Sequence, residues 1–328
     1  MVALMATALA TLMSYPAVAL TSHRTPVDRL TRLERALGPG CPRLLVKRDD
    51  LLSFGLGGNK VRKLQTIASE AMRVGADTLI TCGALQSNHA RVTAATGAAL
   101  GLKVVLVLNG TRPQVARGNL HHDLLFGADV RIVEHRTDRD EAMVAAAEEI
   151  TASGGRPFVI PVGGSTPTGA IGMARGVAEL GLDGVRPDII LHASSSSGTQ
   201  AGLTAGCALL GSKARVVGVS ADEPADVLTA RVEDLVGRMA AVLGGSPAML
   251  LGPHPVDVDD SQVGEGYGMP TPASREAMEL VARTQGIVLD PVYTSKAMAG
   301  LMARVRAGQF AEDQTILFWH TGGLSGEG

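Results

Sequence analysis

The sequence has few aromatic residues, few cysteines and no excess of charge of either sign. Phe, Tyr and Trp make up only 3 % of the 328 residues, so a core must be built from Ala, Val, Leu, Ile and Met. Such residues suit buried parallel strands that helices cover on both faces. Lys and Arg number 30 against 32 Asp and Glu, and no basic run breaks this balance. Neither a nucleic acid nor an anionic membrane is therefore an expected partner.

The three cysteines, Cys41, Cys82 and Cys207, are odd in number and lack the spacing of a zinc site. We expect no disulfide framework and no metal, and a reducing, cytoplasmic location is the simpler interpretation. No segment reaches the roughly 18 uninterrupted apolar residues of a membrane span. Residues 1–20 are apolar but lack the Lys or Arg of a secretory signal, so we expect an amphipathic helix that leads into the fold.

Apolar strand-like runs alternate with helical patterns along most of the chain. The expected strands are residues 43–47, 78–81, 103–108, 130–133, 157–160, 188–192, 215–220 and 315–319. The expected helices begin near residues 59, 89, 119, 140, 199, 225 and 272, and a further one opens in the glycine cluster of residues 163–173 and runs to residue 181. Strand–helix–strand units of this length imply right-handed crossovers and parallel sheets. The predicted fold class is α/β, with two interleaved domains of twisted, mostly parallel sheets flanked by helices.

A hydroxyl-rich loop lies between an expected strand and an expected helix, at residues 194–199, which read Ser-Ser-Ser-Ser-Gly-Thr. Backbone N–H groups at a helix N-terminus are unpaired and attract anions, and hydroxyls add further donors. Helix capping alone needs one or two such residues rather than five. The loop therefore favours phosphate binding over simple capping.

Two more loops of this kind precede helices. Residues 57–60, Gly-Gly-Asn-Lys, place Lys60 at a helix start, where the dipole disfavours a cation, so a local role for the amine competes with an ordinary surface lysine. Residues 86–89, Gln-Ser-Asn-His, could bind a substrate carboxylate or simply cap the next helix through Ser87 or Asn88. The glycine spacing matches neither a P-loop nor a dinucleotide-binding motif.

Five segments together resemble the D-cysteine desulfhydrase/1-aminocyclopropane-1-carboxylate (ACC) deaminase family of fold type II pyridoxal phosphate (PLP) enzymes. They are GGNKVRKL (57–64), QSNHAR (86–91), SSGTQAGL (196–203), LDPVYTSKAMAGL (289–301) and HTGG (320–323). The likeness extends from about Tyr15 to the C-terminus. It implies PLP as cofactor, a small amino acid as substrate and a homodimer. It also implies a large PLP-binding domain of residues 1–60 plus 170–328 and a small domain of residues 61–169.

The resemblance implies roles for single residues. Lys60 would carry PLP as a Schiff base, Asn88 would bind its 3-hydroxyl oxygen, and Thr321 would face its ring nitrogen. The phosphate would lie against Ser195, Ser196, Ser197, Gly198 and Thr199. The substrate would contact Gln86, Ser87, His89 and Thr294, and the implied catalytic residues are Lys60, Ser87, Tyr267 and Tyr293.

A few positions distinguish the two branches of the family. His89, Thr294 and Thr321 resemble the D-cysteine desulfhydrases, whereas Gln200 resembles the other branch. Thr321 and Thr294 in place of a carboxylate imply a weaker electron sink, which suits loss of an α-proton and a β-thiol better than opening of a cyclopropane. The expected reaction is α,β-elimination on D-cysteine. ACC deamination, cysteate sulfo-lyase activity or another amino-acid substrate are alternatives, as is a catalytically silent binding protein.

Five residues depart from the family pattern. Ser195 and Ser197 replace glycines of the phosphate loop, and we expect them to do so without adopting a positive φ. Thr166, Met173 and Ser295 also differ from the usual residues and are expected at or near the substrate pocket.

Overall fold

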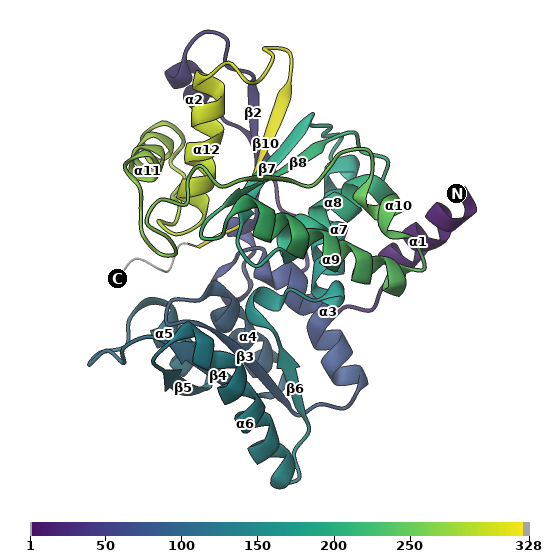
Figure 1. Cartoon of the computed structure of the whole chain (residues 1–328), viewed down its shortest axis with the longest axis vertical. Helices are drawn as coiled ribbons and strands as arrows, with labels where there is room; N and C mark the ends of the chain where they lie inside the picture. The colour runs from purple at the N-terminus through teal and green to yellow at the C-terminus, as the bar shows by residue number, and fades with distance from the viewer. Residues whose placement is uncertain (1, 324–328) are drawn as a thin grey trace.

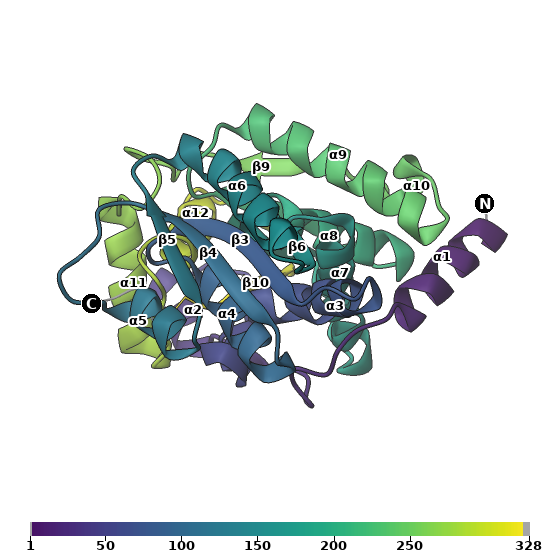
Figure 2. The ribbon, with the colours of Figure 1, turned by 90° about the horizontal axis from the view of Figure 1, so that it is seen from below.

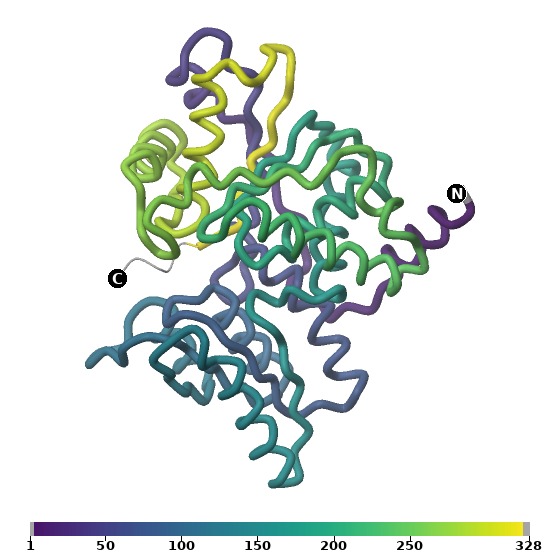
Figure 3. The backbone as a smooth tube through the Cα atoms, in the orientation of Figure 1, coloured from purple at the N-terminus to yellow at the C-terminus, as the bar shows by residue number. Residues whose placement is uncertain are grey.

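Two β-sheets organise residues 2–323, which are the residues that this computed structural model describes (Figure 1). The larger sheet has the strand order β1 (Val27–Arg29), β2 (Arg43–Arg48), β10 (Thr315–His320), β7 (Ile189–Ser194), β8 (Arg215–Ser220) and β9 (Asp257–Asp259). Its strands pair in parallel, except that β1 is antiparallel to β2. The C-terminal strand β10 thus lies between β2 and β7, and Figure 3 shows the purple segment of β2 beside the yellow segment of β10.

The smaller sheet contains four parallel strands from one stretch of the chain. Its order is β5 (Asp129–Val133), β4 (Lys103–Asn109), β3 (Thr78–Ala84) and β6 (Pro157–Ile160). The central strands β3 and β4 are buried along almost their whole length, as expected for parallel strands covered on both faces. The α/β class with mostly parallel sheets is confirmed.

Helices cover both sheets (Figure 2). They are α1 (Val2–Ser14), α2 (Thr31–Leu37), α3 (Lys60–Arg73), α4 (Asn88–Leu100), α5 (Gly118–Leu125), α6 (Arg139–Ala152), α7 (Pro167–Leu182), α8 (Gly198–Leu209), α9 (Ala225–Leu243), α10 (Pro247–Leu251), α11 (Pro272–Gln285) and α12 (Thr294–Arg306). Short 3₁₀ turns follow β2 (η1, Asp49–Leu51; η2, Phe54–Leu56), precede α6 (η3, Arg136–Asp138) and precede α7 (η4, Val162–Gly164). No helix within residues 2–323 is long and apolar enough to cross a membrane.

The expected strands and the longer helices are present with ends shifted by up to three residues. The expected N-terminal helix is α1, of which Ala8 and Leu12 are buried in a cluster with residues of α7, α8 and α9. The sequence pattern missed α2, α10, α12, β1 and β9. Helix α3 packs against both α7 and α4 and therefore joins the two lobes. The domain boundaries expected from the sequence remain a prediction.

Candidate active site

Loops that follow the carboxyl ends of strands from both sheets line one cavity between the lobes. They contribute Lys60 after β2, Ser87 after β3, Ser195 after β7, Asp222 after β8 and Thr321 after β10. In open parallel sheets, ligands bind in the crevice at the carboxyl ends of the strands. The topology therefore brings together residues that are far apart in the sequence.

The glycines before Lys60 let the chain turn tightly at the floor of the cavity. The Gly58 N–H donates to the Asp49 carbonyl and the Asn59 N–H to the Thr321 carbonyl, both at 2.9 Å. Gly58 has a φ of 98°, and a Cβ there would lie 3.0 Å from the Thr321 carbonyl oxygen. Only glycine combines that φ with that approach. The loop is thus tied to the ends of β2 and β10, and Lys60 begins α3 above them.

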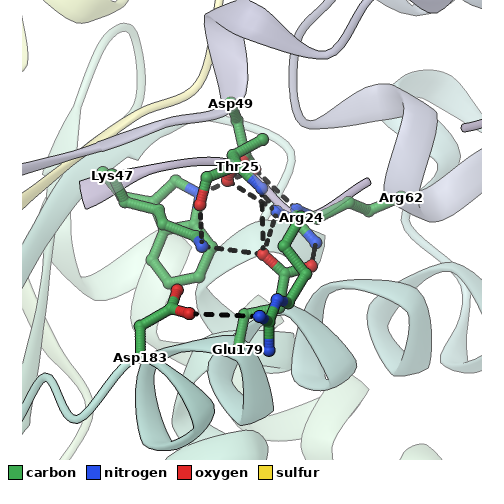
Figure 4. A network of polar contacts seen from close by, with 8 residues as sticks. Arg24, Thr25, Lys47, Asp49, Arg62, Glu179 and Asp183 are labelled. Carbon is green, nitrogen blue, oxygen red and sulfur yellow. Dashed lines mark hydrogen bonds and ion pairs between the residues drawn. The ribbon is translucent and has the colours of Figure 1, made fainter. Parts of the chain in front are cut away.

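A buried polar network anchors the first turn of α3 (Figure 4). Asp49 accepts from Arg62 Nε at 2.8 Å and Nη2 at 2.7 Å, and Trp319 Nε1 donates to the same carboxylate at 2.7 Å. Glu179 on α7 pairs with both Arg62, at 2.6 Å, and Lys47, at 2.7 Å. Since these groups are buried and mutually paired, their geometry is narrowly defined. The network therefore fixes the helix that carries Lys60.

Three lysines near the cavity differ in how their amines are held. Lys296 Nζ donates to three backbone carbonyls, those of residues 221, 263 and 266, at 2.8–2.9 Å. Lys63 Nζ donates to the Gly163 carbonyl at 3.0 Å, and Lys63 does not line the cavity. Lys60 lines it and has one hydrogen bond, to Asn59 Oδ1 at 3.2 Å. Lys60 is therefore the lysine best placed to react with a ligand.

Removal from water lowers the pKa of Lys60 from 10.5 to about 8. The negative charge of Asp290 opposes this shift and the positive charge of Arg91 adds to it. A larger fraction of the amine is consequently neutral near physiological pH than for an exposed lysine. The neutral amine is the nucleophile that bonds an aldehyde.

The hydroxyl-rich loop curls over the N-terminus of α8. Ser195, Ser196, Ser197 and Thr199 line the cavity. Ser197 has a φ of 65° and a ψ of −35°, and the Gly198 N–H donates across it to the Ser196 carbonyl at 2.8 Å, which is a γ-turn of the rare positive-φ form. The expectation that no serine here adopts a positive φ was therefore wrong for Ser197: the turn is kept although glycine is absent.

Gly198 does not line the cavity, but its lack of a side chain lets Lys63 and Ser165 lie close to the first turn of α8. A Cβ at Gly198 would lie 2.8 Å from Lys63 Nζ and 2.8 Å from Ser165 Oγ. The buried Lys63 amine thus lies against the first turn of α8, and burial together with the charge of Lys60 holds its pKa well below 10.5. The sequence analysis missed this role, although GGNKVRKL places Lys63 three residues after Lys60, on the same face of a helix.

Two side chains set the orientation of Asn88. Its Oδ1 accepts from Arg91 Nη1 at 3.0 Å and from Asn119 Nδ2 at 3.1 Å. The Asn88 amide nitrogen is therefore left as a donor toward the cavity that the residue lines. Arg91 Nη2 also donates to the Gly57 carbonyl at 2.9 Å, so one buried guanidinium links Asn88 to the lysine loop. Arg91 and Asn119 are further residues that sequence reasoning missed.

Ser87 and His89 also lie at the start of α4. Ser87 Oγ accepts from the Ala90 N–H at 3.2 Å and caps the helix. The Thr81 hydroxyl donates to the Ile160 carbonyl at 2.7 Å, so it accepts from His89 Nε2 at 2.9 Å. Burial and the charges of Lys60 and Lys63 hold the pKa of His89 well below 6.5. His89 is thus a neutral imidazole, and its Nδ1 has no hydrogen-bond partner among the described residues.

Tyr267 and Tyr293 form a pair at the cavity. Their hydroxyl oxygens are 2.5 Å apart and their rings meet edge to face. Asp290 holds the turn before α12, because its carboxylate accepts from the N–H groups of residues 292–294. Burial raises the pKa of Tyr293 well above 10, so its hydroxyl stays protonated.

Several predicted residues lie outside the cavity. The Thr294 hydroxyl donates to Asp290 at 2.6 Å and is fully buried, so it does not face a ligand. The Gln86 side chain accepts from the Asn119 N–H at 2.8 Å and holds the start of α5 instead. Among the family departures, Thr166 caps α7 and Met173 lies in the core beside Trp319. Ser295, on α12, is buried and does not line the cavity.

The residues of the cavity fit a phosphate-bearing aldehyde. Lys60 offers an amine, and the N-terminus of α8 offers backbone donors at a hydroxyl-rich turn. Gly58 and Gly163 let the lining segments pack closely against Thr321 and Ser196. His89 Nδ1 and the Asn88 amide nitrogen add an acceptor and a donor. These groups are the ones that would hold PLP.

Comparison with known proteins agrees with this geometry. The family described as "Pyridoxal-phosphate dependent enzyme" matches residues 18–322, which identifies the protein as a PLP-dependent enzyme of fold type II. Within that class, the chain belongs to the D-cysteine desulfhydrase/ACC deaminase family. It is 38 % identical over 320 residues to D-cysteine desulfhydrases of Yersinia pestis (strain Pestoides F) and of Yersinia enterocolitica, covering 95 % of both chains in each case.

Solved structures give the same result. A crystal structure described as an ACC deaminase homologue is 36 % identical and superposes with a TM-score of 0.89, covering 98 % of this chain and 95 % of that one. A PLP-dependent aspartate racemase, 19 % identical with a TM-score of 0.68 and covering 98 % of this chain and 95 % of its own, shares the fold.

Proposed function

We propose that this enzyme catalyses α,β-elimination on a small β-substituted amino acid, with D-cysteine as the default substrate. One observation carries the proposal: Lys60 is an amine of lowered pKa in a cavity whose β10 end presents Thr321 rather than a carboxylate. Among the described lining residues, the carboxylates are Asp222 and Glu223, which follow β8. The full-length likeness to D-cysteine desulfhydrases and, equally, to ACC deaminases supports a lyase of this family, and the choice of D-cysteine over ACC depends on Thr321.

The proposed reaction converts D-cysteine and water to pyruvate, ammonia and hydrogen sulfide. Bound PLP supplies an electron-withdrawing ring that stabilises negative charge on the α-carbon of an amino acid. Lys60 removes the α-proton, the Cβ–S bond breaks with the electron pair leaving on sulfur, and a carbon–carbon double bond forms. The released enamine reacts with water to give the keto acid and ammonia.

The remaining lining residues would bind and orient. The N-terminus of α8 binds the phosphate, and the buried Lys63 amine lies against the same turn. The Asn88 amide nitrogen donates to the cofactor, Ser87 with the start of α4 holds the substrate carboxylate, and Thr321 faces the ring nitrogen. Tyr267 and Tyr293 lie where the β-substituent leaves and can move a proton to it.

The electronic argument for excluding ACC now depends on Thr321 alone, because Thr294 is occupied with Asp290. ACC has no α-proton, so its ring opens with charge developing into the cofactor. A neutral hydroxyl gives about half the stabilisation of a charge-assisted hydrogen bond. A deficit of about 3 kcal/mol corresponds to roughly a hundredfold loss of rate.

The test is a substrate panel of D-cysteine, L-cysteine, β-chloro-D-alanine, cysteate and ACC, assayed for keto acid. We expect pyruvate from D-cysteine or β-chloro-D-alanine and little 2-oxobutyrate from ACC. Comparable kcat/KM for ACC and D-cysteine would contradict the electronic argument. A cofactor absorbance band without turnover of any member would favour a silent ligand-binding protein.

We also propose that the enzyme is a homodimer in the cytoplasm and that its domains have the boundaries expected from the sequence. The family resemblance and the paucity of cysteine support these points. Light scattering on the purified holoenzyme, with a mass twice that of the 33.8 kDa chain as the expected result, tests the dimer.

A further inference from the structure

Three arginines from the two lobes line the outer part of the cavity. Arg136 lies in η3 and Arg139 begins α6, both in the lobe of the four-stranded sheet, whereas Arg231 lies on α9 in the other lobe. A small neutral β-substituent such as a thiol has no need of three guanidinium groups. Their presence therefore calls for a separate explanation.

The carboxylates at this place do not neutralise all three. Glu223 Oε1 lies 3.3 Å from Arg136 Nη2 and 3.3 Å from Arg231 Nη1, so two arginines share one oxygen atom. Among residues 2–323, no carboxylate lies within 4.0 Å of the Arg139 guanidinium. One positive charge in the cavity is thus without a counter-ion in the described part of the chain.

Arg139 is also held in a defined direction. Its Nε donates to the Arg136 carbonyl at 2.9 Å. The two Nη groups have no hydrogen-bond partner among the described residues, so they remain as donors. An arginine fixed at Nε and open at both Nη groups can bind a carboxylate, sulfonate or phosphate through parallel hydrogen bonds.

Asp222 is the other carboxylate of this region, and it does not pair with Arg139. One of its oxygen atoms, Oδ1, is buried without a hydrogen-bond partner. Burial raises the pKa of Asp222, and a hydrogen bond from Ser195 opposes the rise. A carboxyl group in this environment bears less negative charge than an exposed one at mildly acid pH.

Arg139 and the tyrosine pair line the same cavity. The positive charge of Arg139 acts on Tyr267, where it opposes the rise in pKa that burial causes. It acts on the Cys82 thiol of β3 in the same sense. Under the proposed function, the tyrosine pair faces the β-substituent of the substrate. Arg139 is then near the far end of the substrate's side chain.

From these contacts we propose that Arg139 binds an anionic group at the end of the substrate's side chain, so that an acidic β-substituent adds to the affinity that any α-amino acid, D-cysteine included, has for this cavity. Arg136 and Arg231 add positive potential around this group. The inference rests on the proposed function in two respects, namely that the cavity binds an α-amino acid and that the β-substituent faces the tyrosine pair. If the arginines serve only to hold the lobes together through Glu223, Arg139 has no part in ligand selection.

Direct binding tests the proposal without requiring turnover. The holoenzyme is titrated with D- and L-aspartate and, in parallel, D- and L-asparagine, while the absorbance of the bound cofactor is followed. The two side chains have nearly the same shape and differ in charge. We expect aspartate of the accepted configuration to bind about tenfold or more tightly than asparagine, and the preference to shrink as the salt concentration rises.

Arg139→Gln should abolish the preference and change the affinity for asparagine less than twofold. Arg139→Lys keeps the positive charge but lacks the two Nη donors of the guanidinium, so it should retain part of the preference for aspartate. Arg238→Gln is the matched control, because Arg238 lies on α9 like Arg231 but pairs with Asp234 at the surface. Equal affinities of aspartate and asparagine in the unaltered enzyme would overturn the proposal, and so would an undiminished preference in Arg139→Gln or a failure to bind either ligand.

The same proteins distinguish this inference from the proposed reaction. A preference for aspartate that requires Arg139, with no keto acid from D-cysteine, β-chloro-D-alanine or cysteate, would sink the elimination and leave the inference standing. Turnover of β-chloro-D-alanine with no preference for aspartate would do the reverse.

Discussion

Asp49 and Arg62 meet through two parallel hydrogen bonds, of 2.8 and 2.7 Å, in the buried layer beneath the cavity. Both residues are directly connected to the segment that carries the reactive lysine. The Asp49 carbonyl accepts from Gly58 in the loop before Lys60, and Arg62 lies two residues after it. The ion pair therefore couples the stability of the fold to the position of the Lys60 amine.

Asp49→Asn should destabilise the protein by about 3–5 kcal/mol, because it leaves the Arg62 guanidinium buried with less compensation. Urea unfolding measures the loss. The control is Glu276→Gln, which removes an exposed partner of Arg306 and should cost about 1 kcal/mol or less. Equal stabilities of the two variants would show that the buried network contributes little.

The same pair predicts how stability depends on pH. Burial raises the pKa of Asp49, but the charge and hydrogen bonds of Arg62 outweigh it and hold that pKa below 3.8. The contribution of ionised Asp49 to the free energy of unfolding is therefore fully present above the unfolded-state pKa of about 3.9. It is lost as the pH falls through the lower folded-state pKa. The acid slope of stability should be shallower in Asp49→Asn than in the unaltered protein, and an unchanged slope would contradict this assignment.

Ser197 and Ser195 should respond differently to replacement by glycine. Ser197 has a φ of 65°, whereas Ser195 is not among the residues with positive φ. Ser197→Gly relieves strain of about 1–2 kcal/mol and loses about 0.5–1 kcal/mol in unfolded-chain entropy. Ser195→Gly relieves no such strain, so only the loss from unfolded-chain entropy acts on its stability.

Thermal unfolding of the holoenzyme should thus give an equal or higher Tm for Ser197→Gly and a lower Tm for Ser195→Gly. The opposite order would mean that Ser197 does not hold the positive φ in solution.

Uptake of PLP by the apoenzyme should follow the titration of Lys60. With a pKa of about 8, the amine is protonated and unreactive below that pH and neutral above it. The rate at which the cofactor band forms should rise with pH and level off above about pH 8. Arg91→Met removes a positive charge that lowers this pKa, so its midpoint should shift upward, whereas Arg91→Lys should keep it. A midpoint near 10.5 in the unaltered protein would contradict the burial of the amine.

The sequence predicted those parts of the site that are encoded locally. Lys60, Ser87, Asn88 and Ser196 each lie in a short polar segment between an apolar strand and a helix, and parallel strands place such segments at one edge. Arg91 and Arg139 were missed because a lysine or arginine on a helix gives no sign of burial or of a partner from the other lobe. Tertiary contacts alone determine those properties.

Two residues predicted to contact the substrate do not line the cavity, for a related reason. Gln86 and Thr294 adjoin cavity residues in the sequence, but their side chains satisfy backbone or carboxylate groups on the protein side. Helix α12 was missed because it is buried on most faces and is rich in Ala, Met and Gly. Its sequence therefore lacks the 3.6-residue alternation of apolar and polar residues that predicts a helix. Its start depends on Asp290, whose carboxylate caps the turn.

The most direct test of this account is to find which lysine carries the cofactor. Borohydride reduction of the holoenzyme fixes PLP to that side chain, and peptide mapping by mass spectrometry then identifies it. We predict label on Lys60, and loss of the cofactor band in Lys60→Ala. Label on Lys63 or Lys296 would contradict the assignment of the site, because their amines donate hydrogen bonds to backbone carbonyls in this structure.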